Sequence, residues 1–309
     1  MQIINILAPV FLIIVLGVLL KRTNFLSAEF VSGLNNLVYW IGLPCLLFYE
    51  IVIAKYDGVA AKTTFLVVLG GMAGSIVAGY LIAGLLKIPA GAVGTFVQGA
   101  FRGNLMYIGL PIVLYSFAFD TQKEAMTNTA VLVLAFIIPI YNIAAVIVLL
   151  ASQHRIDRLI FGKILGQLVT NPLVIATAAA FLYKWAFGDL HLWLGRTISA
   201  IGNIALPLAL LGIGGTLAEG KIAGRQGPAL VASVIKCFVT PAVGLLLVYL
   251  LGLNSNEARI ALIYLACPAA VVSYVMADQL EGDPKMAAAT VLVSTCISVL
   301  SLGAVLAIF

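Results

Sequence analysis

The sequence predicts an all-α integral membrane protein whose ten transmembrane helices form an inverted repeat of five plus five. The first observation is composition. Of 309 residues, 63% are hydrophobic and 9% charged, and the mean hydropathy is +1.15, whereas soluble chains are about half apolar and a quarter charged. The second is the length of the apolar runs, which reaches the roughly 20 residues that a helix needs to cross a bilayer. The third is their continuity, because membrane barrel strands would alternate instead.

Ten apolar runs are separated by glycine, proline, asparagine and charged residues, and each is predicted to form one helix. The first run is not expected to be a cleaved signal peptide, because no basic residue precedes it and Lys21 and Arg22 follow it. The runs occupy residues 3–20, 30–53, 64–86, 92–117, 126–150, 161–185, 194–217, 227–251, 259–279 and 286–308.

The distribution of Lys and Arg predicts the orientation, because cytoplasmic loops carry an excess of both. The bias is sharpest in the central loop, residues 154–163, which we place in the cytoplasm. Ten spans then put both termini outside, in a multi-pass protein of a bacterial inner (plasma) membrane. With this orientation the cytoplasmic side holds Lys21, Arg22, Lys87, Arg155, Arg158, Lys163, Lys221, Arg225 and Lys285.

Two features of the first half recur in the second. The second helix of each half has a Leu-Pro step, which ends at Pro44 in one and at Pro207 in the other. The fourth helix of each half has a helix-breaking residue near its middle, Gly103 and Pro268. Because five is an odd number of spans, the second half must enter the membrane from the opposite face, which predicts an inverted repeat.

Matched helix breaks indicate a binding site within the membrane. Unpaired backbone groups are tolerated at that depth only inside protein or beside a watery cavity. Two broken helices that cross there would direct half-helix amino termini, each partly positive, at one point. An anion would suit that point, although Gly and Pro are also common as simple kinks in membrane helices.

Other function classes find little support. The basic residues form no patch for nucleic acid, and the four cysteines lie in apolar runs without metal-ligand spacing. His154 and His191 lie in loops predicted on opposite sides of the membrane, and the GIGG at 212–215 lacks the Lys of a phosphate loop. We therefore expect no enzymatic activity, no cofactor, no bound metal and no nucleic-acid partner.

Several motifs resemble the auxin efflux carrier family, which includes plant PIN proteins and bacterial malate or malonate permease homologues. They follow one another in the family's order and cover almost the whole chain. The sequence departs from plant members in having Gly103 where they usually have Pro, and in its short central loop. The motifs are SGLNNLVYWIGLPCLLF at 32–48, GNLMYIGLP at 103–111, KCFVTPA at 236–242 and CPAAVVSYVMADQLEGDP at 267–284.

The resemblance implies a division of the ten helices into two domains. Helices 1, 2, 6 and 7 (residues 1–53 and 161–217) would form a scaffold domain that also makes a homodimer. Helices 3–5 and 8–10 (residues 64–150 and 227–308) would form a transport domain in which helices 4 and 9 cross, with the central cytoplasmic loop at 151–160. The implied function is secondary transport of a small organic anion, such as a dicarboxylate or an auxin-like acid, with membrane lipid around the protein.

Arg102 and Asn104 are the first candidates for contact with this anion. A guanidinium at mid-bilayer is costly and needs a partner, and its planar fork suits a carboxylate. The alternatives for Arg102 are an ion pair with Glu50 or hydrogen bonds to carbonyls of the broken helix. Asn104 aligns with the crossover Asn of the family, and it also suits the cap of the second half-helix.

The remaining candidates surround the same breaks. Gly103, Pro268 and Ala269 would contribute backbone to the anion site, and Asn142 would contribute its amide, with interhelical hydrogen bonding as its alternative role. Lys236 is expected to neutralise carbonyl ends at the crossover.

Coupling remains open at the level of sequence. The options are sodium coupling, proton coupling and uniport driven by the membrane potential. Proton coupling would need an intramembrane carboxylate, for which Glu50 and Asp278 are the candidates. A sodium- or proton-coupled transporter of another solute class and an anion channel are the rival functions.

Overall fold

The computed structural model describes residues 2–53, 58–153, 166, 169–219 and 226–309. In this part of the chain the secondary structure consists of helices and one isolated antiparallel bridge. Seven of the helical segments are long and apolar enough to cross a membrane, and Leu105–Ser116 and Pro172–Phe187 are shorter apolar helices. The expectation of an all-helical membrane protein is confirmed at this level.

The first half of the chain contains the elements up to the central loop. Each lies at a predicted apolar run, and the helix ends differ from the predicted ends by a few residues. They are α1 (Gln2–Arg22), α2 (Ala28–Leu37), η1 (Val38–Gly42), α3 (Leu43–Ile53), α4 (Gly58–Leu85), α5 (Ala90–Phe101), η2 (Leu105–Gly109), α6 (Leu110–Ser116) and α7 (Lys123–Ser152).

The second half follows the same pattern after the loop. Helix α9, which begins at Pro172, corresponds to the run predicted at 161–185. Most of the central loop lies outside the described residues, which exclude 154–165 and 167–168. The elements are α9 (Pro172–Phe187), α10 (Leu192–Glu219), α11 (Gln226–Val234), η3 (Ile235–Val239), α12 (Thr240–Leu251), α13 (Ser255–Ala266), α14 (Val272–Gln279) and α15 (Pro284–Ile308).

Three π-helical segments, η1, η2 and η3, each end just before a Leu-Pro or Thr-Pro step, at Pro44, Pro111 and Pro241. In each, the residue before the proline donates its backbone N–H to the carbonyl five residues back. A proline inside a helix would otherwise clash with the carbonyl four residues back, and a π-turn relieves that crowding. Pro207, by contrast, lies within the regular helix α10.

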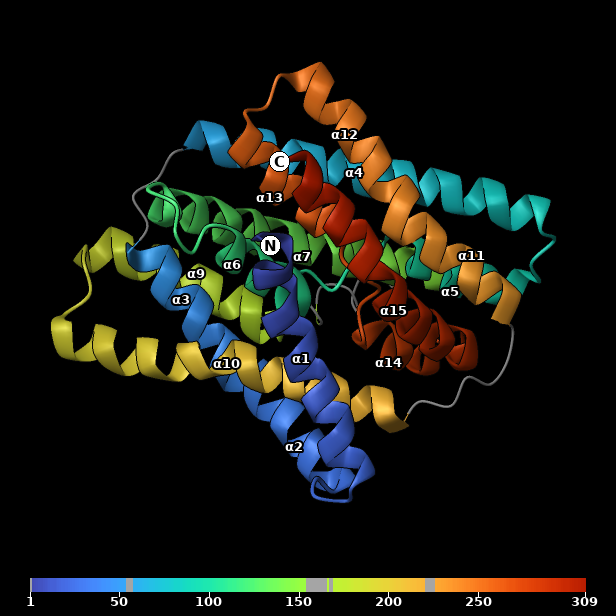
Figure 1. Ribbon diagram of the computed structural model, residues 1–309, viewed down its shortest axis with the longest axis horizontal. Helices are drawn as coiled ribbons and strands as arrows, with labels where there is room; N and C mark the ends of the chain where they lie inside the picture. Colours follow the sequence, from blue (N-terminus) through green and yellow to red (C-terminus); the bar gives the residue numbers. More distant parts are fainter. Residues whose placement is uncertain (1, 54–57, 154–165, 167–168, 220–225) are drawn as a thin grey trace.

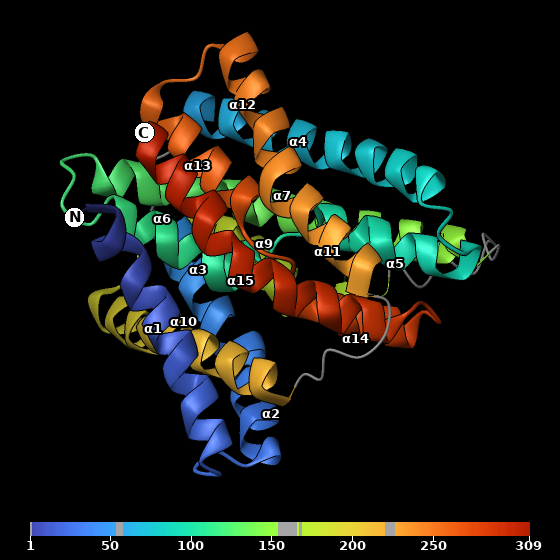
Figure 2. The same ribbon diagram turned by 45° about the vertical axis from the view of Figure 1, so that its right-hand side comes forward.

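The helices pack in two groups. In one, α1 and α3 lie against α10, and α9 packs on α3; in the other, α4 and α5 pack with α7, and α11–α15 cover them. Figure 1 shows the first group at lower left and the second at upper right, and Figure 2 separates them again. The start of α1 and the end of α15 lie at the left-hand side of the molecule in Figure 2.

Candidate functional site

The second group contains two interrupted helices. The first stops at Phe101, the end of α5, and resumes at Leu105 with η2 and α6. The second stops at Ala266, the end of α13, and resumes at Val272 with α14. The interruptions fall at the glycine and the proline from which the sequence predicted them.

The two interruptions meet and pair with each other. The backbone N–H of Asn104 donates to the carbonyl of Pro268 at 2.8 Å, and the N–H of Ala270 donates to the carbonyl of Arg102 at 3.0 Å. These two bonds form an antiparallel bridge between Gly103 and Ala269. We refer to residues 102–104 and 268–270 as the crossover.

Lys236 lies on one side of the crossover and is fully buried. Its Nζ donates to the carbonyl of Leu265 at 2.5 Å, near the carboxyl end of α13. A Cβ atom added at Gly103 would lie 3.0 Å from the Cε atom of Lys236. The absence of a side chain at Gly103 therefore leaves room for the lysine.

Hydroxyl groups satisfy other backbone groups on the same side. Ser301 donates to the carbonyl of Ala266 at 3.1 Å, and Thr240 donates to that of Ala100 at 3.3 Å. The Oγ atom of Ser294 accepts from the N–H of Ala269 at 2.9 Å. Carbonyls at the carboxyl ends of both interrupted helices are therefore already paired with protein donors.

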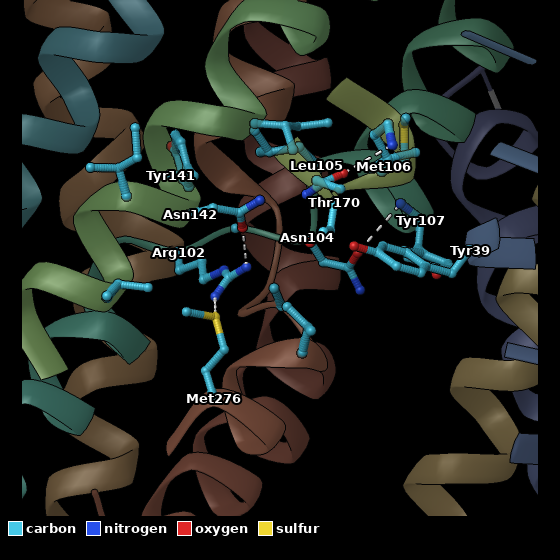
Figure 3. Close-up of a pocket in the computed structure, with 18 of the residues that line it drawn as sticks. Tyr39, Arg102, Asn104, Leu105, Met106, Tyr107, Tyr141, Asn142, Thr170 and Met276 are labelled. Carbon is cyan, nitrogen blue, oxygen red and sulfur yellow. Dashed lines mark hydrogen bonds between the residues drawn. The ribbon is translucent and has the colours of Figure 1, made fainter. Parts of the chain in front are cut away.

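A cavity of about 340 Å³ borders the crossover, and Lys236 does not belong to its lining. Its lining comes from both groups of helices, with η1 and the start of α9 facing α7, η2 and α14. Figure 3 shows Arg102 beside Asn142 and Met276, with Thr170, Tyr107 and Tyr39 beyond Asn104. The polar lining side chains are Tyr39, Arg102, Asn104, Tyr107, Tyr141, Asn142, Thr170 and Asn171.

Arg102 is 6% exposed and supplies the one formal charge in the lining. One of its terminal nitrogens donates to Oδ1 of Asn142 at 2.5 Å, and the other donates to the sulfur of Met276. Both partners are neutral, and within the described chain Arg102 makes no ion pair with Glu50. The structure therefore does not support the ion-pair alternative for Arg102.

Asn104 caps the second half of its interrupted helix. Its Oδ1 accepts from the backbone N–H of Tyr107 at 3.3 Å, as a helix-capping Asn does. The side chain is 4% exposed and lines the cavity. Its Nδ2 makes no hydrogen bond to the described residues, so two N–H donors are available there.

Two half-helix amino termini border the cavity. The first residues of η2, Leu105 and Met106, and the first residue of α14, Val272, belong to its lining. The first backbone N–H groups of a helix have no partner within it, and the aligned peptide dipoles make this end partly positive. The cavity therefore combines a guanidinium, free amide donors and helix amino termini, all of which favour negative charge.

The structure brings together some of the residues predicted from sequence and separates others. Arg102, Gly103, Asn104 and Asn142 line the cavity, and Pro268 and Ala269 form the bridge beside it. Other predicted residues do not belong to the lining: Lys236, Glu50, Pro44 and Pro207.

Sequence reasoning missed six lining residues, namely Tyr39, Trp40, Tyr141, Met276 and, at the start of α9, Thr170 and Asn171. The tyrosines and the methionine carry no local signal in a chain that is apolar throughout. The start of α9 does carry one, because Asn171-Pro172 interrupts the apolar run at 161–185, and an Asn before a Pro is typical of a helix start. Among the described residues no group of three or more His, Cys, Asp or Glu is placed to hold a metal ion.

Comparison with known proteins agrees with the helical membrane architecture. A family model described as membrane transport protein matches residues 2–158 and 153–305. An uncharacterized transporter of Methanocaldococcus jannaschii is 20% identical over 297 residues, covering 94% of each chain. An uncharacterized transporter of Methanothermobacter thermautotrophicus is 22% identical over 305 residues, covering 95% of this chain and 94% of its own. The chain therefore belongs to the membrane transport protein family, the auxin efflux carrier family whose motifs its sequence contains.

Proposed function

We propose that this protein is a secondary transporter that moves small carboxylate-bearing organic anions, such as a dicarboxylate or an auxin-like acid, by alternating access. Membership of a transporter family supports the general function. The substrate class rests on one observation, which is that Arg102 is buried, has only neutral partners and lines a cavity.

The electrostatics of the crossover support an anion over a cation. A charged side chain within a membrane costs about 2.5–3.5 kcal/mol on insertion scales, and an anionic guest would offset that cost. The carbonyl oxygens that a sodium ion would need are already bonded at Leu265 and Ala266. Among the described residues of the lining, the groups left for an occupant include donors at Arg102, at Asn104 and at the amino ends of η2 and α14, and the hydroxyl of Tyr141.

In this proposal the carboxylate lies between Arg102 and Asn104. The guanidinium supplies the charge and a planar set of N–H donors, which pair with both oxygens of a carboxylate. Asn104 supplies Nδ2 while its Oδ1 continues to cap η2. Lys236 has a supporting role, since it neutralises carbonyl ends on the far side of the same crossover.

We propose ten spans arranged as a five-plus-five inverted repeat, with both termini outside a bacterial inner membrane. The position of both ends on one side of the molecule in Figure 2 supports an even number of spans. The two groups of helices correspond to the proposed scaffold and transport domains, and the cavity lies where they meet. Movement of one group against the other would open the cavity to alternate sides, and the scaffold would form the homodimer.

Transport in proteoliposomes tests this function. Purified protein is assayed with a panel of mono- and dicarboxylates under imposed pH, sodium and voltage gradients, which separates proton coupling, sodium coupling and uniport. We expect saturable uptake of at least one carboxylate and counterflow of labelled substrate. An anion channel would conduct without counterflow, and lack of carboxylate uptake under every gradient would reject the proposal.

A second test concerns Asn104 alone. Replacement by Ser preserves a capping oxygen but removes the amide donors, so the helix start should survive while substrate affinity falls. We expect Asn104→Ser to raise the dissociation constant about fivefold, the value of roughly one neutral hydrogen bond. Unchanged affinity would exclude Asn104 from the site.

A further inference from the structure

The start of α9 forms part of the lining of the cavity. Asn171 precedes this helix and is 8% exposed, and Pro172 occupies its first position. The Oδ1 atom of Asn171 accepts from the backbone N–H of Leu173 at 2.9 Å and from that of Val174 at 3.4 Å. These bonds hold the amide plane in one orientation, with its oxygen turned toward the helix.

The nitrogen of the same amide has no partner among the residues that the structure describes. Nδ2 of Asn171 makes no hydrogen bond to the described residues, and it is not sealed off as a buried unpaired atom. Because the residue lines the cavity, its two N–H donors are available to an occupant. The neighbouring Thr170 gives its hydroxyl proton to the carbonyl of Gly166 at 2.8 Å, so only acceptor capacity remains there.

Asn171 thus repeats the arrangement of Asn104 from another element of the lining. Each caps a helix through Oδ1 and leaves Nδ2 to the cavity. Asn104 belongs to the group of helices that carries Arg102, whereas α9 packs on α3 in the other group. The lining of the same cavity also includes apolar side chains, among them Ile138, Ile143 and Leu173.

We infer that Asn171 is a second recognition residue of this cavity, donating its amide hydrogens to an oxygen atom of the transported anion other than the carboxylate at Arg102. The inference rests on the proposed function and narrows its substrate class. The preferred substrate has oxygen functions at two separated positions, joined by a short apolar segment. A simple fatty acid would make no hydrogen bond with the amide N–H groups of Asn171 and would therefore bind less tightly.

Binding of matched acids tests the inference. The four-carbon probes are butanoate, 4-hydroxybutanoate and succinate, which share a carboxylate and differ at the far end. The six-carbon probes are hexanoate, 6-hydroxyhexanoate and adipate, which sample a longer separation. Dissociation constants are measured by titration calorimetry for the wild-type protein and for Asn171→Ser, in which the capping oxygen is retained and the amide donors are lost.

The matched control is Asn254→Ser. Asn254 caps α13 in the same way, accepting from the N–H groups of Asn256 and Glu257 at 3.0 and 2.9 Å, but it does not line the cavity. We expect the wild type to bind the hydroxy acid or the dicarboxylate of one chain length at least fivefold more tightly than the simple acid. Asn171→Ser should abolish this preference without changing the affinity for the simple acid, and Asn254→Ser should preserve it.

Two outcomes of the titrations with the wild type and Asn171→Ser overturn the inference while the proposed function stands. One is equal binding of all three acids at both chain lengths by the wild type, and the other is a preference that persists in Asn171→Ser. Asn171→Asp is the second variant, since it retains the cap and adds a negative charge. This variant should bind every one of the carboxylates more weakly than the wild type does. Undiminished binding by a folded Asn171→Asp protein also overturns the inference. Failure of the proposed function is a different result, namely that the wild type binds none of the six acids or that Arg102→Gln binds them all as the wild type does.

Discussion

Two buried cations flank the crossover, and they differ in what surrounds them. Lys236 is enclosed by packed helices and donates to the carbonyl of Leu265, among hydroxyl groups that satisfy neighbouring backbone. Arg102 has an amide and a thioether as partners and lines a cavity. Gly103 contacts both environments, because it lines the cavity and a Cβ atom added to it would lie 3.0 Å from the Cε atom of Lys236. A buried charge therefore marks a candidate binding site only where donors remain unused beside a cavity.

The largest expected effect is that of Arg102→Gln on substrate affinity. A charge-assisted hydrogen bond contributes about 1.5–3 kcal/mol, so the dissociation constant should rise roughly 10- to 100-fold. The melting temperature without substrate should not fall, because the substitution removes a buried charge that has no acidic partner in the described chain. Arg102→Lys should recover only part of the affinity, since the planar fork is lost. If substrate still raises the melting temperature of Arg102→Gln, Arg102 is not the residue that holds the anion, and its proposed difference from Lys236 is wrong.

Lys236→Met should show the opposite pattern, a loss of stability with a smaller change in affinity. The substitution keeps the chain length but leaves the carbonyl of Leu265 without its donor, which costs about 1–3 kcal/mol. Chemical denaturation in detergent measures the loss, and Lys285→Met, at an exposed position in the first turn of α15, is the control. Wild-type stability of Lys236→Met would show that the lysine is not needed at the crossover.

Asn142→Leu should have an intermediate effect that depends on Arg102. The side chain keeps its shape but loses the oxygen that holds the guanidinium, so we expect about fivefold weaker substrate binding. In the Arg102→Gln background the same change should add nothing, because the two residues act as one unit. Asn203→Leu provides the control, since Asn203 is exposed on α10 and its amide bonds to Ser199 of the same helix. Additive effects of Asn142→Leu and Arg102→Gln would show that Asn142 acts independently.

The smallest effect is expected for Met276→Leu. A thioether is a weak hydrogen-bond acceptor, and leucine fills a similar volume. The dissociation constant should change by less than about threefold, measured in parallel with Asn142→Leu. A loss as large as that of Asn142→Leu would mean that the sulfur contributes more to positioning the guanidinium than its chemistry indicates.

Much of the candidate site was within reach of the sequence. Arg102, Asn104 and Asn142 stand out because polar residues are rare in long apolar runs, and all three line the cavity. The alternative pairing of Arg102 with Glu50 is not seen in the described structure, where the guanidinium donates to Asn142 and Met276 instead. Asn171 is not among the site residues expected from the sequence, although an Asn-Pro step inside an apolar run is a recognisable helix start.

The sequence by itself determined the helical segments and the two interruptions, because apolar length and the effects of Gly and Pro on backbone are local properties. Only the tertiary structure decided which side chains meet. Helices that are apolar all round carry no facial pattern from which their rotation or depth can be read. That Asn142 and Met276, from α7 and α14, hold Arg102, and that Asn171 faces the same cavity, depends on how helices distant in sequence pack together.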